Sequence, residues 1–167
     1  PTRRSSDLGN KIYFSPTATN IESTTINGTA GYTKDNIHLE YMTTQNRTLT
    51  YSEYSSNPAG TTTFTAFGKY FDLSLDSNEG VSNLVLYIYY TQADLDAMGI
   101  TENQITGLYY WNDTVSGWEL YPRQEVVTTD TDGYAGYVRV ELDHLTPMTL
   151  GADTTAPAIP SDFKAEA

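Results

Sequence analysis

Apolar and polar residues alternate in several separate stretches between Ile37 and Leu150, and this alternation restricts the fold more than any other feature. Successive side chains of a β-strand point to opposite faces of a sheet, so a period of two predicts strands with one buried and one solvated face. The pattern is clear in residues 37–41, 70–75 and 137–142. Turn signals such as Asp132-Gly133 separate these stretches. Together they predict an all-β fold, and specifically an antiparallel β-sandwich.

Two further stretches refine this prediction. Residues 84–90 (LVLYIYY) are apolar on both faces, which predicts a central strand that is covered on both sides. Directly afterwards, Thr91 and Asp94 have the spacing of a capping box, Leu95 can pack one helical face, and Gly99 can end the turn. The sequence therefore predicts an antiparallel β-sandwich with one short helical turn.

The charge balance excludes several classes of partner. The chain has 21 acidic and 9 basic side chains and a net charge of -12. Unaided binding to nucleic acid requires Lys and Arg that displace counterions from phosphates, so no nucleic-acid partner is expected. The same acidity disfavours anionic membrane surfaces. No stretch approaches the ~18 apolar residues of a membrane span, so no membrane insertion is expected either.

Shifts in composition divide the chain into segments. Residues 1–8 (PTRRSSDL) resemble the translation of a sequencing adapter and are expected to be an artefact, as in a metagenomic fragment. Residues 9–33 form a polar N-terminal segment, for which we expect either an edge strand or two, or the tail of a preceding module. Residues 34–152 are the expected β-sandwich domain, and residues 153–160 (DTTAPAIP) are the expected linker. Residues 161–167 begin another alternating strand, and this junction resembles the lead-in to a fibronectin type III domain.

Motifs of known catalytic chemistry are scarce. The chain has two histidines and no cysteine, and it lacks both the G-x-S-x-G and the H-E-x-x-H pattern. Carboxylates are numerous, but their spacing does not select the pair that a glycosidase needs. Asp130, Asp132 and Asp153 could contribute to a calcium site at a loop end. We therefore expect no enzyme, no resident metal and no cofactor, with calcium binding left open.

Aromatic side chains offer a second kind of site. Tyr109, Trp111 and Trp118 could expose flat rings on which sugar faces stack, which makes them the tentative ligand-binding residues. Sandwich cores also use Tyr and Trp, with the polar atom at the rim. A carbohydrate-binding module of a polysaccharide-degrading enzyme is therefore one alternative function.

From Asn83 onward the sequence resembles a known kind of module. NLVLYIYYTQADLDAMGI, LYYWNDTVSGWELYP and YVRVELDHLTPMTL are similar to a β-sandwich module of large secreted or cell-surface proteins of bacteria and archaea. Such modules often lie beside fibronectin type III domains, in agreement with the expected linker. The resemblance implies a non-catalytic structural or adhesion module of a secreted or surface-attached protein. Its partners would be neighbouring β-domains of the same chain, with cell-surface glycans or proteins as further candidates.

The last segment has a second resemblance. Residues 110–112 (YWN), Gly117-Trp118 and residues 144–146 (HLT) resemble the end of the autoproteolysis-inducing (GAIN-like) domain of adhesion receptors. That family can cut itself between the second and third residues of His-Leu-Thr, although its bracing cysteines are absent here. The resemblance implies another alternative function, a self-cleaving sandwich.

In that alternative, cleavage would fall between Leu145 and Thr146. His144 would act as the base for the Thr146 hydroxyl, which would attack the Leu145 carbonyl. The alternation of residues 138–142, when extended, places His144 on the inward face of a strand. Pro147 restricts the backbone of Thr146. The other interpretation of the same tripeptide is that it only completes the sandwich.

Overall fold

The computed structural model describes residues 18–34, 36–129 and 132–155 of this chain. The expected adapter segment 1–8 lies outside them, as do the residues from 156 on that would hold the rest of the linker and the new strand. The described residues form nine strands, the helix α1 (Gln92–Met98) and a 3-10 turn at Glu102–Gln104. The strands are β1 (Ala18–Lys34), β2 (Ile37–Tyr54), β3 (Thr65–Leu75), β4 (Val81–Tyr90), β5 (Ile105–Asn112), β6 (Gly117–Leu120), β7 (Gln124–Val127), β8 (Gly136–Glu141) and β9 (Met148–Ala152).

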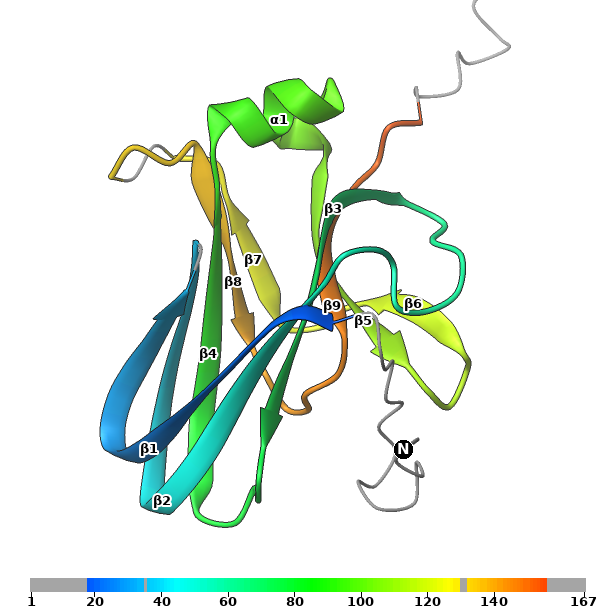
Figure 1. The fold of residues 1–167 in the computed structure, drawn as a ribbon. Coiled ribbons are helices and arrows are strands. Elements are labelled where there is room, and N and C mark those ends of the chain that lie inside the picture. Colours follow the sequence, from blue (N-terminus) through cyan, green and yellow to red (C-terminus); the bar gives the residue numbers. More distant parts are fainter. Residues whose placement is uncertain (1–17, 35, 130–131, 156–167) are drawn as a thin grey trace, which may run out of the picture.

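All strands join one antiparallel sheet in the order β6-β5-β9-β3-β2-β4-β8-β7, with β1 beside β2. β2 determines the shape of this sheet, because residues 37–43 pair with β4 whereas residues 49–54 pair with β3. Two wings therefore leave opposite ends of a single long strand, and the sheet curls (Figure 1). The prediction of an antiparallel all-β fold with one short helix is confirmed. Strand pairing alone does not divide the sheet into two separate layers.

The inner face of the curled sheet holds the hydrophobic core. Both wings contribute, as Leu86 and Val140 come from one and Phe71 and Leu108 from the other. The largest fully buried side chains are Tyr51, Tyr90, Tyr121, Phe71, Ile37, Leu39, Leu49, Leu73, Leu86, Leu95 and Leu108. Since one cluster uses residues from both wings, neither wing can bury its apolar face without the other.

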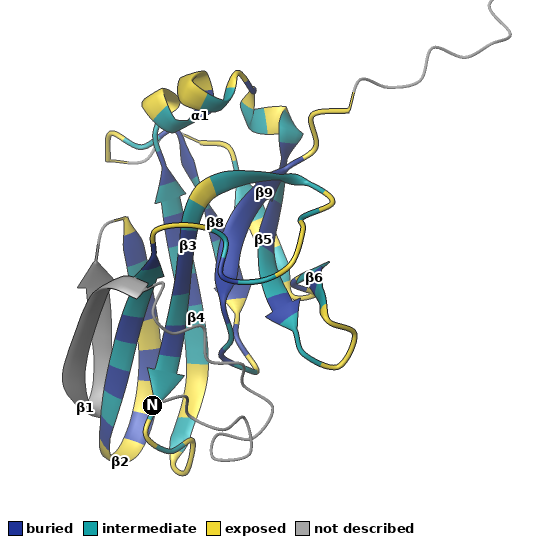
Figure 2. Cartoon of the chain, turned by 45° about the vertical axis from the view of Figure 1, so that its right-hand side comes forward, coloured by how far each residue is buried: buried dark blue, intermediate teal, exposed yellow. Residues whose placement is uncertain are grey.

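The alternation of the sequence is visible in the burial of the strands (Figure 2). In β4, Leu86, Ile88 and Tyr90 are buried, while Tyr87 and Tyr89 are half-buried. The prediction that residues 84–90 are covered on both faces is therefore wrong. β4 is central, because it lies between β2 and β8, but nothing in the described residues covers its outer face completely. Tyrosine gives both faces an apolar appearance, although its hydroxyl tolerates water.

The predicted helical turn is confirmed as α1. The Thr91 hydroxyl accepts a hydrogen bond from the Asp94 N–H over 3.2 Å, and the Asp94 carboxylate accepts one from the Thr91 N–H over 2.7 Å. Leu95 is fully buried, and Gly99 ends the helix at φ 65°. No helix in the described part of the chain has the length and apolar character needed to cross a membrane.

The sheet begins before the expected domain boundary at residue 34. β1 pairs with β2 along residues 18–34, with irregularities near Asn20 and Gly28. The sequence left open an edge strand or the tail of a preceding module for residues 9–33, and residues 18–34 form the edge strand β1. An edge strand needs few apolar residues, because pairing is a backbone interaction and one of its edges has no neighbour.

An amide side chain joins the two ends of the curled sheet. Gln124 of β7 accepts a hydrogen bond from the Leu108 N–H over 2.6 Å, and its amino group donates to the Leu108 carbonyl oxygen over 3.2 Å. The side chain thus pairs with β5 much as another strand would. Gly107 lies at φ 127°, and a Cβ there would collide with the Gln124 amide. Glycine therefore permits this close approach.

We expect Gln124→Ala to lower the free energy of unfolding by about 1–3 kcal/mol, because the Leu108 N–H loses its acceptor. The Leu108 carbonyl keeps the hydrogen bond that it accepts from the Tyr121 N–H over 2.9 Å. Urea denaturation followed by circular dichroism measures the change. Gln92→Ala is the matched control, since the Gln92 amide donates to Asp96 on the exposed side of α1. A Gln124→Ala protein as stable as this control would contradict the closing role of Gln124.

Candidate functional site

The loop between β8 and β9 carries the tripeptide singled out in the sequence. Leu142 and Leu145 are buried and fix the loop to the core. His144 lies between them with 36% of its side chain exposed. The expectation that His144 faces inward is therefore wrong. β8 ends at Glu141, the chain bends, and Leu145 takes the inward position that strict alternation assigns to His144.

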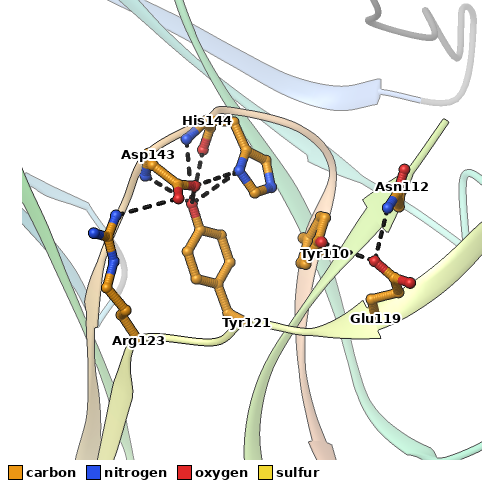
Figure 3. Close-up of polar contacts among 7 residues, drawn as sticks. All are labelled: Tyr110, Asn112, Glu119, Tyr121, Arg123, Asp143 and His144. Atoms are coloured by element: carbon orange, nitrogen blue, oxygen red, sulfur yellow. Dashed lines mark hydrogen bonds and ion pairs between the residues drawn. The ribbon is translucent and has the colours of Figure 1, made fainter. Parts of the chain in front are cut away.

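The phenol of Tyr121 is the centre of this loop (Figure 3). Tyr121 follows β6 and is 1% exposed. Its hydroxyl oxygen accepts hydrogen bonds from the backbone N–H groups of Asp143 and His144 over 2.8 and 3.2 Å. The same hydroxyl donates to Asp143 Oδ1 over 2.7 Å. One side chain therefore satisfies two loop donors, which would otherwise lie unpaired beside the core.

Asp143 links Tyr121 to the ring of His144 and to the guanidinium of Arg123. Its Oδ1 lies 2.5 Å from His144 Nδ1, and its Oδ2 accepts a hydrogen bond from Arg123 over 3.2 Å. Burial raises the pKa of Asp143, but the hydrogen bonds from Tyr121 and His144 and the charge of Arg123 outweigh it, so the pKa is lowered. The pKa of Tyr121 is raised, mainly because the phenol is buried. The loop therefore holds a carboxylate beside a neutral phenol at neutral pH.

The ring of His144 is fixed by aromatic neighbours. It stacks on Tyr121, with centroids 4.9 Å apart and planes 15° from parallel, and it meets Tyr110 edge-on at 4.4 Å. Because a carboxylate only accepts, the contact with Asp143 places a proton on Nδ1 and leaves Nε2 of the neutral ring as an acceptor. Nε2 is buried without a hydrogen-bond partner, and so is the hydroxyl of Thr146. The orientation suits a base, but the two atoms form no hydrogen bond with each other.

A second polar group lies beside this ring (Figure 3). The Glu119 carboxylate accepts hydrogen bonds from Asn112 over 2.7 Å and from Tyr110 over 2.8 Å. These two bonds, with that of Asn112 the larger, lower the pKa of Glu119. Glu119 is thus an anchored carboxylate with both donors on β5, which connects the β5–β6 hairpin to the His144 ring through Tyr110.

A cleft of about 250 Å³ runs beside the loop. Asn78, Ser82 and Asn83 line it from the β3–β4 side, and Asp143 and His144 line it from the β8–β9 loop. Asn83 has a positive φ of 53°. The lining mixes polar and apolar side chains, and Asp143 is its single carboxylate among the described residues, so the cleft does not form the acid pair of a glycosidase.

The tentative ligand-binding residues lie in a separate aromatic cluster. Trp111 and Trp118 are only 6% and 9% exposed, and their rings meet edge-on at 5.9 Å. Tyr109 stacks on Phe64 at 3.6 Å, and Trp118 donates to the carbonyl of Gly60 over 3.2 Å. The β2–β3 connection thus packs onto both indoles. Their faces contact protein side chains, and a sugar platform made of these rings stays a prediction.

The candidate calcium ligands are dispersed. Asp130 lies outside the described residues, and Asp132 occupies the turn at φ 49°. Asp153 accepts hydrogen bonds from the Thr155 N–H and hydroxyl over 2.9 and 2.5 Å, and these bonds lower its pKa. Within residues 18–34, 36–129 and 132–155, no three His, Asp or Glu side chains gather as metal ligands do.

The tripeptide His144-Leu145-Thr146 was found from the sequence, whereas Tyr121, Arg123 and Asp143 were not. Asp143 directly precedes His144, which was the available signal for it. Tyr121 and Arg123 join the loop only through the antiparallel return of the chain, and no local spacing encodes that contact. No family model matches this chain, and no curated protein matches it. The two resemblances therefore stay hypotheses, and the contacts described above carry the functional argument.

We expect Tyr121→Phe to destabilise the protein by about 1–3 kcal/mol, because the N–H groups of Asp143 and His144 lose their acceptor while the ring packing remains. Thermal and urea unfolding measure the effect. Tyr134→Phe is the matched control, since it removes a single hydroxyl that bonds the Asn36 side chain. Equal stability of the two variants would contradict the central role of the Tyr121 hydroxyl.

Asp143 should make stability depend on acidity. Its folded pKa lies below the ordinary value of 3.8, so its contribution is present above about pH 4 and is lost as the pH falls through the folded pKa. We therefore expect the stability difference between wild type and Asp143→Asn to be constant near neutrality and to shrink below about pH 4. Denaturant titrations at successive pH values measure it. Arg123→Gln removes a charge that lowers the pKa of Asp143, so it should narrow the pH range between the folded and unfolded pKa of Asp143. A stability difference between wild type and Asp143→Asn that does not change with pH would contradict the stabilising role of the Asp143 carboxylate.

Proposed function

We propose that this chain is a non-catalytic structural or adhesion module of a secreted or surface-attached multidomain protein. One observation carries the proposal. The residues best suited to acid–base chemistry are Tyr121, Asp143 and His144. Their hydrogen bonds fix the loop that leads into β9. All five residues of β9 are buried between β3 and β5. Anchoring of a buried last strand is what a load-transmitting module requires, since the chain leaves the domain from that strand.

The finer architecture in this proposal is a β-sandwich. The two wings that leave β2 would act as its two layers, with β2 shared between them. The common core built from both wings supports this assignment, as does the direct bond between Gln124 and Leu108 at the far ends of the wings. A shared strand that bends from one layer into the next is a known way to make the corner of such a fold.

The surroundings of the module are part of the proposal. Neighbouring β-domains of the same chain would be its first partners, with a fibronectin type III-like domain after residues 153–160. Secretion or surface attachment fits a composition rich in Tyr and Thr with a net charge of -12. Such acidity favours solubility and discourages self-association outside the cell.

Self-cleavage is the second candidate, and one specific observation favours it. His144 Nε2 and Thr146 Oγ1 are both buried and both lack a hydrogen-bond partner. A buried polar atom without a partner is costly, so two of them within one tripeptide invite a functional explanation. Asp143 holds Nδ1 of the same ring, which leaves Nε2 as the basic nitrogen.

The tripeptide and one water molecule supply all the groups that self-cleavage requires. Nε2 of His144 would take the proton of the Thr146 hydroxyl, whose oxygen would attack the Leu145 carbonyl carbon. The Leu145–Thr146 C–N bond would break, the proton would pass to the new amine, and an ester would remain. Water would then hydrolyse the ester to a Leu145 carboxylate and a free Thr146 hydroxyl. The first proton transfer requires a contact between the two side chains that the loop does not make.

Intact-mass analysis of the purified chain separates the two candidates. For the structural module we expect one full-length species after prolonged incubation at neutral pH, and an identical result for Thr146→Ala. Thr114→Ala, in the β5–β6 turn, controls for the loss of a threonine. Two fragments that meet between Leu145 and Thr146, and that vanish in Thr146→Ala but persist in Thr114→Ala, would reject the non-catalytic proposal in favour of self-cleavage.

A further inference from the structure

Four tyrosine rings form a continuous row on the outer face of the sheet. In order they are Tyr134, Tyr89, Tyr137 and Tyr87, with consecutive centroids 4.9, 5.4 and 5.9 Å apart. His38 extends the row, 5.8 Å beyond Tyr87. We call these five side chains the tyrosine row. Tyr134 precedes β8, Tyr137 lies in β8, Tyr87 and Tyr89 lie in β4, and His38 lies in β2. The row therefore alternates between β8 and β4 before it reaches β2, and these three strands lie side by side (Figure 1).

The row faces solvent because of the period of the strands. The neighbours of its rings along β4 and β8, Leu86, Ile88 and Val138, point into the core and are nearly inaccessible. All members of the row are half-buried. The hydroxyls of Tyr89 and Tyr137 have no hydrogen-bond partner in the part of the chain that the structure describes. Cross-strand aromatic pairs such as Tyr89 and Tyr137 stabilise a sheet, and rings that stay partly open to solvent also offer a surface for binding.

Polar groups border the row along the same strands. Arg139, opposite Tyr87 in the sheet, forms an ion pair with Glu141 over 3.2 Å, and His38 contacts Glu40 over 3.3 Å. Hydrogen bonding to Tyr87 and then to Glu141 raises the pKa of Arg139, so it stays charged. Burial and then Tyr137 and Tyr87 raise the pKa of Tyr89, whose hydroxyl therefore stays protonated and able to donate. Donors and acceptors thus flank a line of apolar rings.

The charge of this face restricts its ligand. Arg139 is already paired, and the acidic side chains Glu40, Glu125 and Glu141 lie on the same outer face of β2, β7 and β8. A polyanion such as a nucleic acid or a sulfated glycan would meet repulsion here. Carboxylates instead accept hydrogen bonds from hydroxyl groups, and tyrosine rings stack on apolar ring faces. These preferences describe an uncharged ligand that is rich in hydroxyls.

We propose that the tyrosine row is a binding face for a single neutral glycan chain. Neighbouring centroids lie 4.9 to 5.9 Å apart, so linked sugars that follow the row would meet several rings. The planes of neighbouring rings differ by 41° to 50°. A flat crystalline polysaccharide needs coplanar rings, whereas one soluble, twisted chain can follow rings that are tilted in turn. The face is distinct from the cluster of Trp111 and Trp118.

This inference goes beyond the proposed function and can fail separately from it. If the tyrosine row binds no glycan, the contacts of Tyr121 and Asp143 are unchanged and the chain can still be a structural module. The intact-mass result concerns Thr146 and leaves the outer face of β4 untouched. A negative result in one experiment therefore does not decide the other.

Affinity electrophoresis in gels that contain a soluble β-glucan, a xylan, a galactomannan or soluble starch tests the proposal. We expect at least one of these neutral polysaccharides to retard the native protein. The double variant Tyr89→Ala/Tyr137→Ala should weaken binding roughly tenfold or more, because two stacking surfaces are lost. Tyr89→Phe/Tyr137→Phe keeps both rings and should retain most of the affinity. Val115→Ala/Leu120→Ala removes exposed apolar side chains near β6 and should change nothing.

A measurement on the wild-type protein covers the case in which the alanine variant does not fold. With selectively labelled tyrosine, NMR should show ring signals of Tyr87, Tyr89 and Tyr137 shifting when the retarding glycan is added. Absence of retardation by every neutral polysaccharide overturns the proposal. So does binding that persists in the alanine variant, that is equally reduced in the control variant, or that occurs only with an anionic polysaccharide or a cationic peptide.

Discussion

The pairing of β2 with different strands at its two ends is the constraint on which the other features depend. Residues 37–43 commit one end to β4, and residues 49–54 commit the other to β3. Because one strand belongs to both wings, neither wing can form its own closed unit, and the apolar faces must meet inside the curl. The closing contact then falls where the wings end, and there a side-chain amide, Gln124, supplies the pairing that no strand provides.

That curvature also separates two surfaces with different chemistry. Around the β8–β9 loop, the polar side chains make contacts that stabilise the fold. Tyr121 holds the loop backbone, and Asp143 joins it to Arg123 and His144. Outside, Tyr89 and Tyr137 keep free hydroxyls among the described residues. A protein that needs only stability could place Thr or Lys at these outward positions. This contrast is the reason for proposing the outer face, rather than the tripeptide loop, as a surface that contacts other molecules.

The elements that were predicted correctly are those set by local pattern. Alternation identified segments within β2, β3 and β8, a continuous apolar run identified β4, and the Thr91–Asp94 spacing identified α1. Hydrophobic period and capping act within a few residues, so the sequence shows them directly. β1 was only one of two alternatives, because an edge strand is held by its partner strand rather than by its composition. Two features escaped. The half-exposed positions Tyr87 and Tyr89 count as apolar in the sequence, and the bend after Glu141 follows the anchoring of Leu142 and Leu145.

The position of His144 shows why a tripeptide alone does not define chemistry. The same contact with Asp143 that frees Nε2 as a base also holds the ring flat against Tyr121, and Tyr121 in turn fixes the loop backbone. To reach the Thr146 hydroxyl, the ring or the loop would have to move against these contacts. Cleavage would need a strained loop that brings the Thr146 hydroxyl to the Leu145 carbonyl carbon, whereas the hydrogen bonds of Tyr121 stabilise the loop in its present conformation. The contacts that make His144 look catalytic are thus the ones that restrain it, which is the physical reason to favour a structural role.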